Sequence, residues 1–353
     1  GRHLFNRRTG LVAALLMFSS VSFWSYGEIA FPYVILAFFS TLVALLAGSS
    51  RLFTQRGIGG ERARPYLVTA VFAVAGGFRQ DLLLFLAPLW LLSLWRESRR
   101  RVVISIVIAG AGLVAWLWPT AQLSGGLVEY QRALSAQSAA VAREYSISGQ
   151  GPIALVINLR DILRYVFYAL YGQVVLLPLA LLWLCFGRGD REVGDRRRGR
   201  GLLLLAWVGP PLLFYSLIHV GDPGYVFSFM PAVHLLLAAA LCWSASLVSE
   251  LRLPSGGSSR RAVARLRALT VARPSMALGV VLAVVMAGNA AVFLWHSRSL
   301  TLPGIRRHDQ VVQETIDYVK AKYADGSAML LASDSYRHVQ YYLPEYPRYW
   351  VDV

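Results

Sequence analysis

Long apolar runs, separated by short arginine-rich segments, dominate this sequence and limit what it can fold into. Several runs reach about 18 residues or more, which is the length that a helix needs to cross a hydrocarbon core of about 30 Å. Of the 353 residues, 56% are hydrophobic and only 15% are charged. A soluble domain could not bury so much apolar surface. The sequence therefore predicts an all-α polytopic membrane protein.

Arg79, Gln80 and Asp81 interrupt one long apolar stretch, with Tyr66–Phe78 before them and Leu82–Trp95 after them. A single straight helix would bury a cation and an anion near the middle of the bilayer, at a cost of about 2.5–3.5 kcal/mol each. About 30 residues would also measure about 45 Å, which exceeds the thickness of the core. We therefore predict a helical hairpin with the three polar residues at its tip.

The arginines predict the topology, because cytoplasmic loops of multi-pass proteins are enriched in Arg and Lys. If the hairpin crosses twice, strict alternation places every arginine-dense loop on one side: Arg51–Arg64, Arg96–Arg101, Arg188–Arg200 and Arg252–Arg273. We expect about nine spans on this basis. The predicted spans are Leu11–Tyr26, Ile29–Gly48, Tyr66–Phe78, Leu82–Trp95, Val102–Pro119, Tyr165–Phe186, Leu202–Val220, Tyr225–Val248 and Met276–Trp295.

The predicted organisation has two parts. Residues 1–296 form a transmembrane helical domain with an outer loop at 120–164, and residues 297–353 form a small extracytoplasmic α/β tail. Within the loop, Leu127–Tyr145 has the pattern of an amphipathic helix that lies on the membrane surface or covers a cavity. The first residue, Gly1, and the strand-like end of the chain lead us to expect a fragment of a longer protein.

The tail carries its own periodic pattern. A helix predicted over Asp309–Tyr323 places Val312, Ile316 and Val319 on one face. Met329–Ala332 reads as a strand. The following segment, Ser335–Tyr342, is predicted to be a helix capped by Asp334.

The net charge of +16 does not indicate nucleic-acid binding, because the cations fall in short loops between apolar runs. The sequence also lacks a Walker loop, a zinc-ligand spacing, a GxSxG elbow and a dinucleotide fingerprint. The two cysteines, Cys185 and Cys242, lie inside apolar runs and are interpreted as packing residues. Because the predicted spans cross a bilayer, membrane lipids are predicted partners.

Three groups on the predicted outer face could carry chemistry, and each also has a structural interpretation. Glu28 either ends a helix hairpin as a solvated carboxylate or serves as a general base or metal-binding acid. Arg79 and Asp81 either pair with each other or snorkel to the interface, or else the Arg79 guanidinium binds a phosphate. His219 either lies at the interface or assists at the same site.

These segments resemble a known family. GRHLFNRRTGLVAALLMFSSVSFWSYGE resembles the third span and second outer loop of GT-C glycosyltransferases, the group that includes protein O-mannosyltransferases and lipid A aminoarabinose transferases. GGFRQDLLLFLAPLWLL and HVGDPGYVFSFMPAVHLLLAAAL resemble later spans of bacterial members. The resemblance covers most of Gly1–Leu300.

The resemblance implies an inverting transfer of a sugar from a polyprenyl-phosphate-linked donor to a lipid, glycan or protein acceptor, on the outer face of a bacterial cytoplasmic membrane. It places Glu28 where many members carry a second acid, often associated with the site or with a metal, so a divalent cation is the cofactor to test. Asp81 joins Glu28 as a candidate catalytic acid, and Arg79 and His219 are assigned to the donor phosphate by position. The family's main catalytic acid would lie upstream of Gly1.

Two other functions remain open. A transporter or flippase of lipid-linked sugars would gather the same groups, but it predicts internal repeats and a polar path, neither of which the sequence displays. A non-catalytic membrane subunit would tolerate replacement of Glu28, Arg79 and His219.

Overall fold

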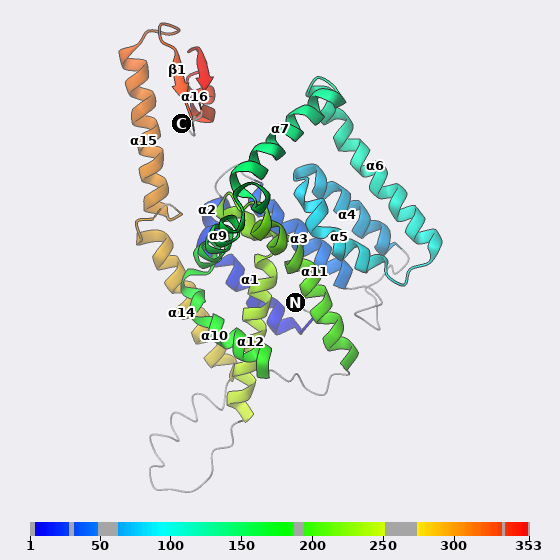
Figure 1. Cartoon of the computed structure of the whole chain (residues 1–353). Helices are drawn as coiled ribbons and strands as arrows, with labels where there is room; N and C mark the ends of the chain where they lie inside the picture. The colour runs from blue at the N-terminus through cyan, green and yellow to red at the C-terminus, as the bar shows by residue number, and fades with distance from the viewer. Residues whose placement is uncertain are drawn as a thin grey trace. The chain divides into compact units, whose positions relative to one another are not determined.

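The computed structural model describes residues 4–27, 32–48, 63–186, 194–250, 274–298, 300–333 and 336–351. The chain divides into two compact units, Gly1–Ala290 and Ala291–Val353 (Figure 1). Each regular element of the first unit in the described ranges is a helix. The α-helices of this unit are α1 (Arg7–Phe18), α2 (Val21–Gly27), α3 (Tyr33–Gly48), α4 (Arg64–Phe78), α5 (Asp81–Leu94), α6 (Arg99–Leu123), α7 (Leu127–Tyr145), α8 (Ile147–Gln150), α9 (Pro152–Leu170), α10 (Leu177–Phe186), α11 (Gly194–Leu217), α12 (Met230–Glu250) and α14 (Pro274–Trp295), and the 3₁₀-helices are η1 (Tyr171–Leu176) and η2 (Pro223–Ser228).

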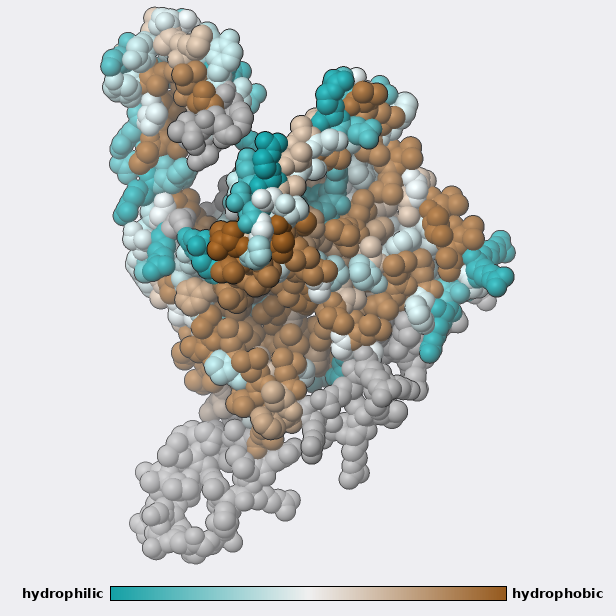
Figure 2. All heavy atoms as spheres, viewed as in Figure 1, coloured by the Kyte–Doolittle hydropathy of each residue, from teal (hydrophilic) through white to brown (hydrophobic). Residues whose placement is uncertain are grey.

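Several helices are long and apolar enough to cross a membrane, as the sequence predicted. Within the described residues there are five such segments, or six if the bent pair of α1 and α2 counts as one span. The five are Arg99–Leu123, Pro152–Phe186, Gly199–Leu217, Met230–Leu247 and Met276–Trp295. On the face seen in Figure 2, hydrophobic residues cover most of the helical body of this unit, while hydrophilic residues gather along α7. The chain is therefore a multi-pass, helical membrane protein.

The predicted count of nine spans is not established by helix length. The apolar helices α3, α4 and α5 have 16, 15 and 14 residues, respectively. A straight span needs about 20 residues. Whether these three cross the membrane therefore remains a prediction.

The predicted hairpin is confirmed, because the chain leaves the helix between Phe78 and Asp81. The two arms, α4 and α5, pack against each other along their length: the rings of Phe72 and Trp90 stack with centroids 5.0 Å apart. The Trp90 indole also donates a 2.9 Å hydrogen bond to the Thr69 hydroxyl. A Cβ atom at Gly76 would lie 2.6 Å from the Leu83 side chain, so a residue without a side chain is needed where the arms approach.

Helix α7 has the bounds that the amphipathic pattern predicted, Leu127–Tyr145, and none of its side chains is buried. It follows α6, which packs along α4 through an indole hydrogen bond from Trp116 to the Ala73 carbonyl at 3.2 Å. The outer loop predicted at 120–164 is therefore largely helical. Helix α9 begins within that segment, at Pro152, because proline suits the first turn of a helix.

Two predicted spans are interrupted, and their interruptions meet at one asparagine. The first span bends by 62° between α1 and α2. The predicted span Tyr165–Phe186 is interrupted where α9 gives way to η1 at Tyr171, whose φ is +42°. Buried Asn289 of α14 donates to the carbonyls of Ser19 at 2.9 Å and Leu170 at 3.3 Å, and it accepts from the Gly172 amide at 2.8 Å. Backbone groups freed by both breaks are thereby satisfied within an apolar environment.

The second unit holds the last residues of α14 and a small α/β structure. Its elements are α15 (Leu302–Lys322), β1 (Leu330–Ala332), α16 (Tyr336–Tyr342) and β2 (Arg348–Trp350). The strands pair in parallel, with Leu331 opposite Tyr349. Ile316, Leu343 and Tyr346 form the core, with Val312 and Val319 packed against it. The helical face predicted for this segment is thus confirmed, while Asp334 lies outside the described residues.

Candidate functional site

The tip of the α4–α5 hairpin holds an ion pair. Arg79 is extended (φ −150°, ψ 123°), and Asp81 begins α5. The Arg79 guanidinium donates from Nε to Asp81 Oδ1 at 3.1 Å and from Nη2 to Oδ2 at 2.6 Å. The two side chains are only 18% and 19% exposed. The carboxylate also lies at a helix N-terminus, where negative charge is favoured.

Two tyrosine rings that contact each other, with centroids 5.5 Å apart, lie beside the same guanidinium. Arg79 Cζ lies 4.5 Å from the centroid of the Tyr225 ring and 5.7 Å from that of Tyr33. Both are cation–π distances, so the two rings stabilise the charge of the guanidinium. Burial lowers the pKa of Arg79, but the charge and hydrogen bonds of Asp81 outweigh burial and raise this pKa above its usual value. Arg79 therefore keeps its charge in a largely buried position.

The ion pair uses only one edge of the guanidinium. Arginine has five N–H donors, and the side-on pair with Asp81 uses the Nε–H and one N–H of Nη2. The fork formed by Nη1 and the second N–H of Nη2 has no hydrogen-bond partner among the described residues. This is the edge that binds phosphate or carboxylate oxygens in a bidentate manner.

The turn after α11 approaches the hairpin tip through Asp222. The Tyr33 hydroxyl donates a 2.7 Å hydrogen bond to Asp222 Oδ2. A Cβ atom at Gly224 would lie 2.3 Å from Cγ of Tyr33. Glycine at this position therefore lets η2 lie directly against the ring of Tyr33. The Gly221 carbonyl accepts a 3.2 Å hydrogen bond from Tyr165 of α9.

His219 contacts Tyr225, one of the two tyrosines beside Arg79. Its ring centroid is 4.5 Å from that of Tyr145 and 6.2 Å from that of Tyr225. Burial lowers the pKa of His219, and nearby Asp222 opposes this shift. The ring is therefore mainly neutral at pH 7. Tyr225 thus contacts both residues that the sequence assigned to a phosphate, Arg79 and His219.

Helix α7 contacts both sides of this cluster. Near its beginning, the Tyr130 hydroxyl accepts a hydrogen bond from Gln80 Nε2 at the hairpin tip. At its end, Tyr145 packs on His219. The exposed helix therefore runs between two points on the rim of the cluster, which we call the Arg79 cluster: Arg79, Asp81, Tyr33, Tyr225, Asp222 and His219.

The sequence prediction included Arg79, Asp81 and His219 and missed three members. Tyr33 begins α3, whereas Asp222 and Tyr225 lie together at the start of η2, far from Tyr33 in the chain. Tyrosines placed at helix ends, next to the polar turns, were the available signal. Glu28 lies outside the described residues, so its predicted role remains a prediction. Within the described ranges, no group of three or more His, Cys, Asp or Glu side chains could hold a metal ion.

Comparisons of the chain with protein-family models, with curated proteins and with solved structures found no match.

Proposed function

We propose that this chain is a membrane glycosyltransferase that moves a sugar from a polyprenyl-phosphate-linked donor to a hydroxyl group of a lipid, glycan or protein acceptor. The proposal extends the sequence resemblance to GT-C glycosyltransferases, and it places the reaction on the outer face of a bacterial cytoplasmic membrane. The supporting observation is the Arg79 guanidinium, which lies at cation–π distance from two tyrosine rings, has one edge on Asp81 and has a second edge whose donors have no partner among the described residues.

The chemistry of the reaction suits this arrangement. When the bond between the anomeric carbon and the phosphate oxygen breaks, negative charge grows on the leaving phosphate. A fixed guanidinium stabilises that charge without reorganising. The acceptor hydroxyl must lose its proton to a base as it attacks. Glu28 and Asp81 are the candidates for this base, and Asp81 must give up part of its pair with Arg79 to take the role.

The tyrosines add a second reason to place a sugar phosphate here. Aromatic faces pack well against the C–H surfaces of sugars, and tyrosine hydroxyls offer hydrogen bonds to ring hydroxyls. Tyr33 and Tyr225 lie within cation–π distance of Arg79. A phosphate bound at the unused fork of Arg79 would therefore bring an attached sugar near one of these rings.

Binding of undecaprenyl phosphate tests the proposal. The purified full chain is titrated with undecaprenyl phosphate and, separately, with undecaprenol, and bound lipid is measured by native mass spectrometry. We expect undecaprenyl phosphate to bind at least about tenfold more tightly, because one charge-assisted bidentate contact is worth about 1.5–3 kcal/mol. Equal binding of the two lipids would contradict the proposal.

Matched variants locate the effect. Arg79→Gln combined with Asp81→Asn removes the ion pair without leaving an unpaired carboxylate, and it should abolish the preference for the phosphate. Arg132→Gln is the control, because Arg132 forms an exposed ion pair with Glu129 on α7. In membranes that hold the protein together with its native donor, Glu28→Gln should sharply reduce sugar transfer while expression stays normal. Normal transfer by Glu28→Gln would remove Glu28 from the mechanism.

One observation favours a transporter as the second candidate. Secondary transporters bind substrates where helices are interrupted in the membrane. The breaks after α1 and after α9 lie together at Asn289. The two functions differ in outcome: a transporter would move a lipid-linked sugar across vesicles without cleaving its phosphate bond, whereas the proposed enzyme would release undecaprenyl phosphate.

A further inference from the structure

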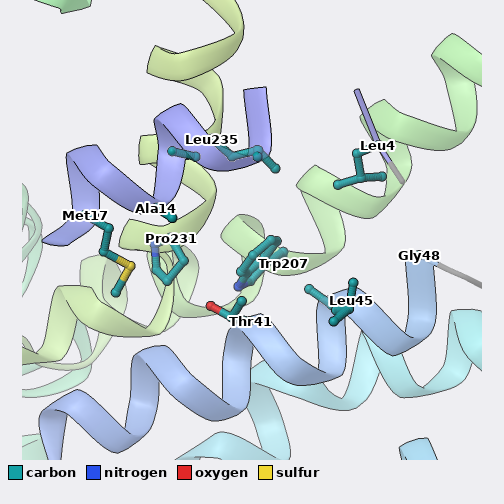
Figure 3. Close-up of a pocket in the computed structure, with 12 residues that line it drawn as sticks. Leu4, Ala14, Met17, Thr41, Leu45, Gly48, Trp207, Pro231 and Leu235 are labelled. Atoms are coloured by element: carbon teal, nitrogen blue, oxygen red, sulfur yellow. The ribbon is translucent and has the colours of Figure 1, made fainter. Parts of the chain in front are cut away.

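An apolar cleft separates α1 from α3. Two adjoining cavities, each of about 280 Å³, share Met17, Thr41 and Leu45 in their walls. Each is nearly twice the volume of an engineered 150 Å³ apolar cavity that holds benzene. Figure 3 shows side chains of α1 and α3 on either side of the first cavity, with Trp207 of α11 and Pro231 and Leu235 of α12 completing its wall.

One face of α3 lines the cleft along most of the helix. Val34, Phe38, Thr41, Leu45 and Gly48 follow one another at spacings of three or four residues. Fourteen residues of helix rise by about 21 Å, so the cleft is long and narrow rather than round. Its walls are almost wholly hydrocarbon. Such a cleft in a membrane protein matches the shape of a lipid chain.

The end of the cleft away from the Arg79 cluster carries positive charge. Gly48 ends α3 there, and a Cβ atom at Gly48 would lie 3.4 Å from Leu203 and 3.8 Å from Leu4. Arg200 binds the Leu4 carbonyl at 3.2 Å and lies 5.3 Å from the centroid of the Phe5 ring. A guanidinium is thus placed at the mouth of the cleft.

Helix α11 arranges its groups in an order that fits a phospholipid. Arg200, Leu203 and Trp207 are spaced by three and four residues and share one face. Trp207 lines the cavity and is only 4% exposed. Its Nε1 is buried and has no hydrogen-bond partner within the described part of the chain. The Trp207 indole N–H, which lacks an acceptor among the described residues, therefore lies about two helical turns along α11 from Arg200.

Helix α1 supplies a second cation on its cleft-lining face. Gly10, Ala14 and Met17 line the first cavity. Arg7, three residues before Gly10, continues this face by one turn and is exposed. Arg7 and Arg200 thus lie on the two helices that border the same mouth.

We propose that the cleft between α1 and α3 binds one acyl chain of an anionic phospholipid from the leaflet at this end of the helices. The phosphate lies at Arg200 and Arg7, and the ester carbonyl of the bound chain accepts the hydrogen bond of Trp207 Nε1. Basic pockets between transmembrane helices bind anionic head groups in this way. The site is distinct from the Arg79 cluster, which lies at the other end of α3, and it does not depend on glycosyl transfer.

Lipid retention tests this site directly. The purified full chain is exchanged into detergent with either dioleoyl phosphatidylglycerol or dioleoyl phosphatidylcholine, and bound lipids are counted by native mass spectrometry. We expect one phosphatidylglycerol per chain, held about 25-fold more tightly than phosphatidylcholine, since each of the two nearby arginines favours an anionic head by about fivefold. Equal retention of the two lipids would overturn the proposal, as would a cleft that holds only water or detergent.

Three variants separate the parts of the site. Ala14→Leu fills the cleft and should abolish retention of the single lipid. Arg7→Gln should lower the preference for phosphatidylglycerol by about fivefold, whereas Arg100→Gln, an exposed arginine at the start of α6, should leave it unchanged. Unchanged retention by a folded Ala14→Leu variant, or equal effects of Arg7→Gln and Arg100→Gln, would overturn the proposal.

Trp207→Phe tests the ester contact without depending on a filled cleft. The wild type should prefer ester-linked over ether-linked phosphatidylglycerol by about fivefold, the value of one neutral hydrogen bond. Trp207→Phe should bind both lipids alike. Absence of the ester preference in the wild type, or a preference for undecaprenyl phosphate over phosphatidylglycerol at this cleft, would show that the occupant is not the phospholipid proposed.

Discussion

The Tyr33 hydroxyl donates a 2.7 Å hydrogen bond to the Asp222 carboxylate across 189 positions of sequence. This bond ties the turn that opens η2 to the beginning of α3. The ring of the same tyrosine lies 5.7 Å from Arg79 Cζ, so three separate segments meet around one aromatic side chain. The geometry of the Arg79 cluster therefore depends on Tyr33.

Removing the Tyr33 hydroxyl should destabilise the protein while keeping the ring. Tyr33→Phe leaves Asp222 without this donor, and hydrogen bonds to charged groups are worth about 1.5–3 kcal/mol. We expect a clearly lower midpoint of thermal unfolding in detergent. Tyr145→Phe is the control, because the Tyr145 ring packs on His219 while its hydroxyl makes no hydrogen bond within the described residues. Equal midpoints for the two variants would show that the Asp222 bond contributes nothing.

Gly224→Ala should disturb the same contact from the other side. The added Cβ atom would lie 2.3 Å from Cγ of Tyr33, and neither the ring nor η2 can move away cheaply. We expect a loss of about 1–3 kcal/mol in the free energy of unfolding. Gly110→Ala in α6 meets no atom within 4 Å and should be neutral or stabilising, since alanine favours a helix. Chemical unfolding in mixed detergent micelles measures both variants, and an unaffected Gly224→Ala would refute the close contact.

Asn289→Leu should destabilise the junction of the two interrupted helices. It keeps the side-chain size but leaves the Ser19 and Leu170 carbonyls and the Gly172 amide without this partner. Each unsatisfied buried group costs about 1–3 kcal/mol. Thermal unfolding of the purified protein provides the measurement. Ala287→Leu adds a leucine at an exposed position of the same helix and should change the midpoint little. A similar midpoint for both would mean that water satisfies the broken ends.

Acid should destabilise the protein in part through His219. Burial lowers the pKa of this ring in the folded protein below the unfolded value, which is about 6.5. Between the two pKa values the unfolded chain binds a proton that the folded chain does not, so the free energy of unfolding falls as pH drops through 6.5. Thermal unfolding at pH 7.5 and 5.0 should therefore show a smaller acid-induced loss in His219→Gln than in the wild type. Exposed His296, replaced by Gln, should leave the loss unchanged.

Several features could be predicted because they depend on local sequence. The charge of Arg79 and Asp81 within an apolar stretch was enough to break the helix there, since burying both charges costs more than forming a tip. The amphipathic period of Leu127–Tyr145 predicted the bounds of α7, and the spacing of Val312, Ile316 and Val319 predicted the face of α15 that contacts the small core.

The interruptions at Ser19 and Tyr171 could not be predicted in the same way. The hydropathy pattern predicts an uninterrupted helix at both places, because the flanking residues are apolar. The breaks are stabilised by Asn289 and by Gln173, which donates to the Leu16 carbonyl at 2.7 Å, and these partners are distant in sequence. A polar group within an apolar run predicts that a partner is needed, but not which one.

The sequence by itself determined that the chain is helical and multi-pass, because long apolar runs have few alternatives in a membrane. It also determined where the hairpin turns. Only the tertiary structure decided that Tyr33 and Tyr225 lie beside Arg79 and that Asp222 binds Tyr33. Apolar helices attract one another without direction, so the choice of neighbours is made by close packing and by a few buried polar bonds that become visible only in the assembled fold.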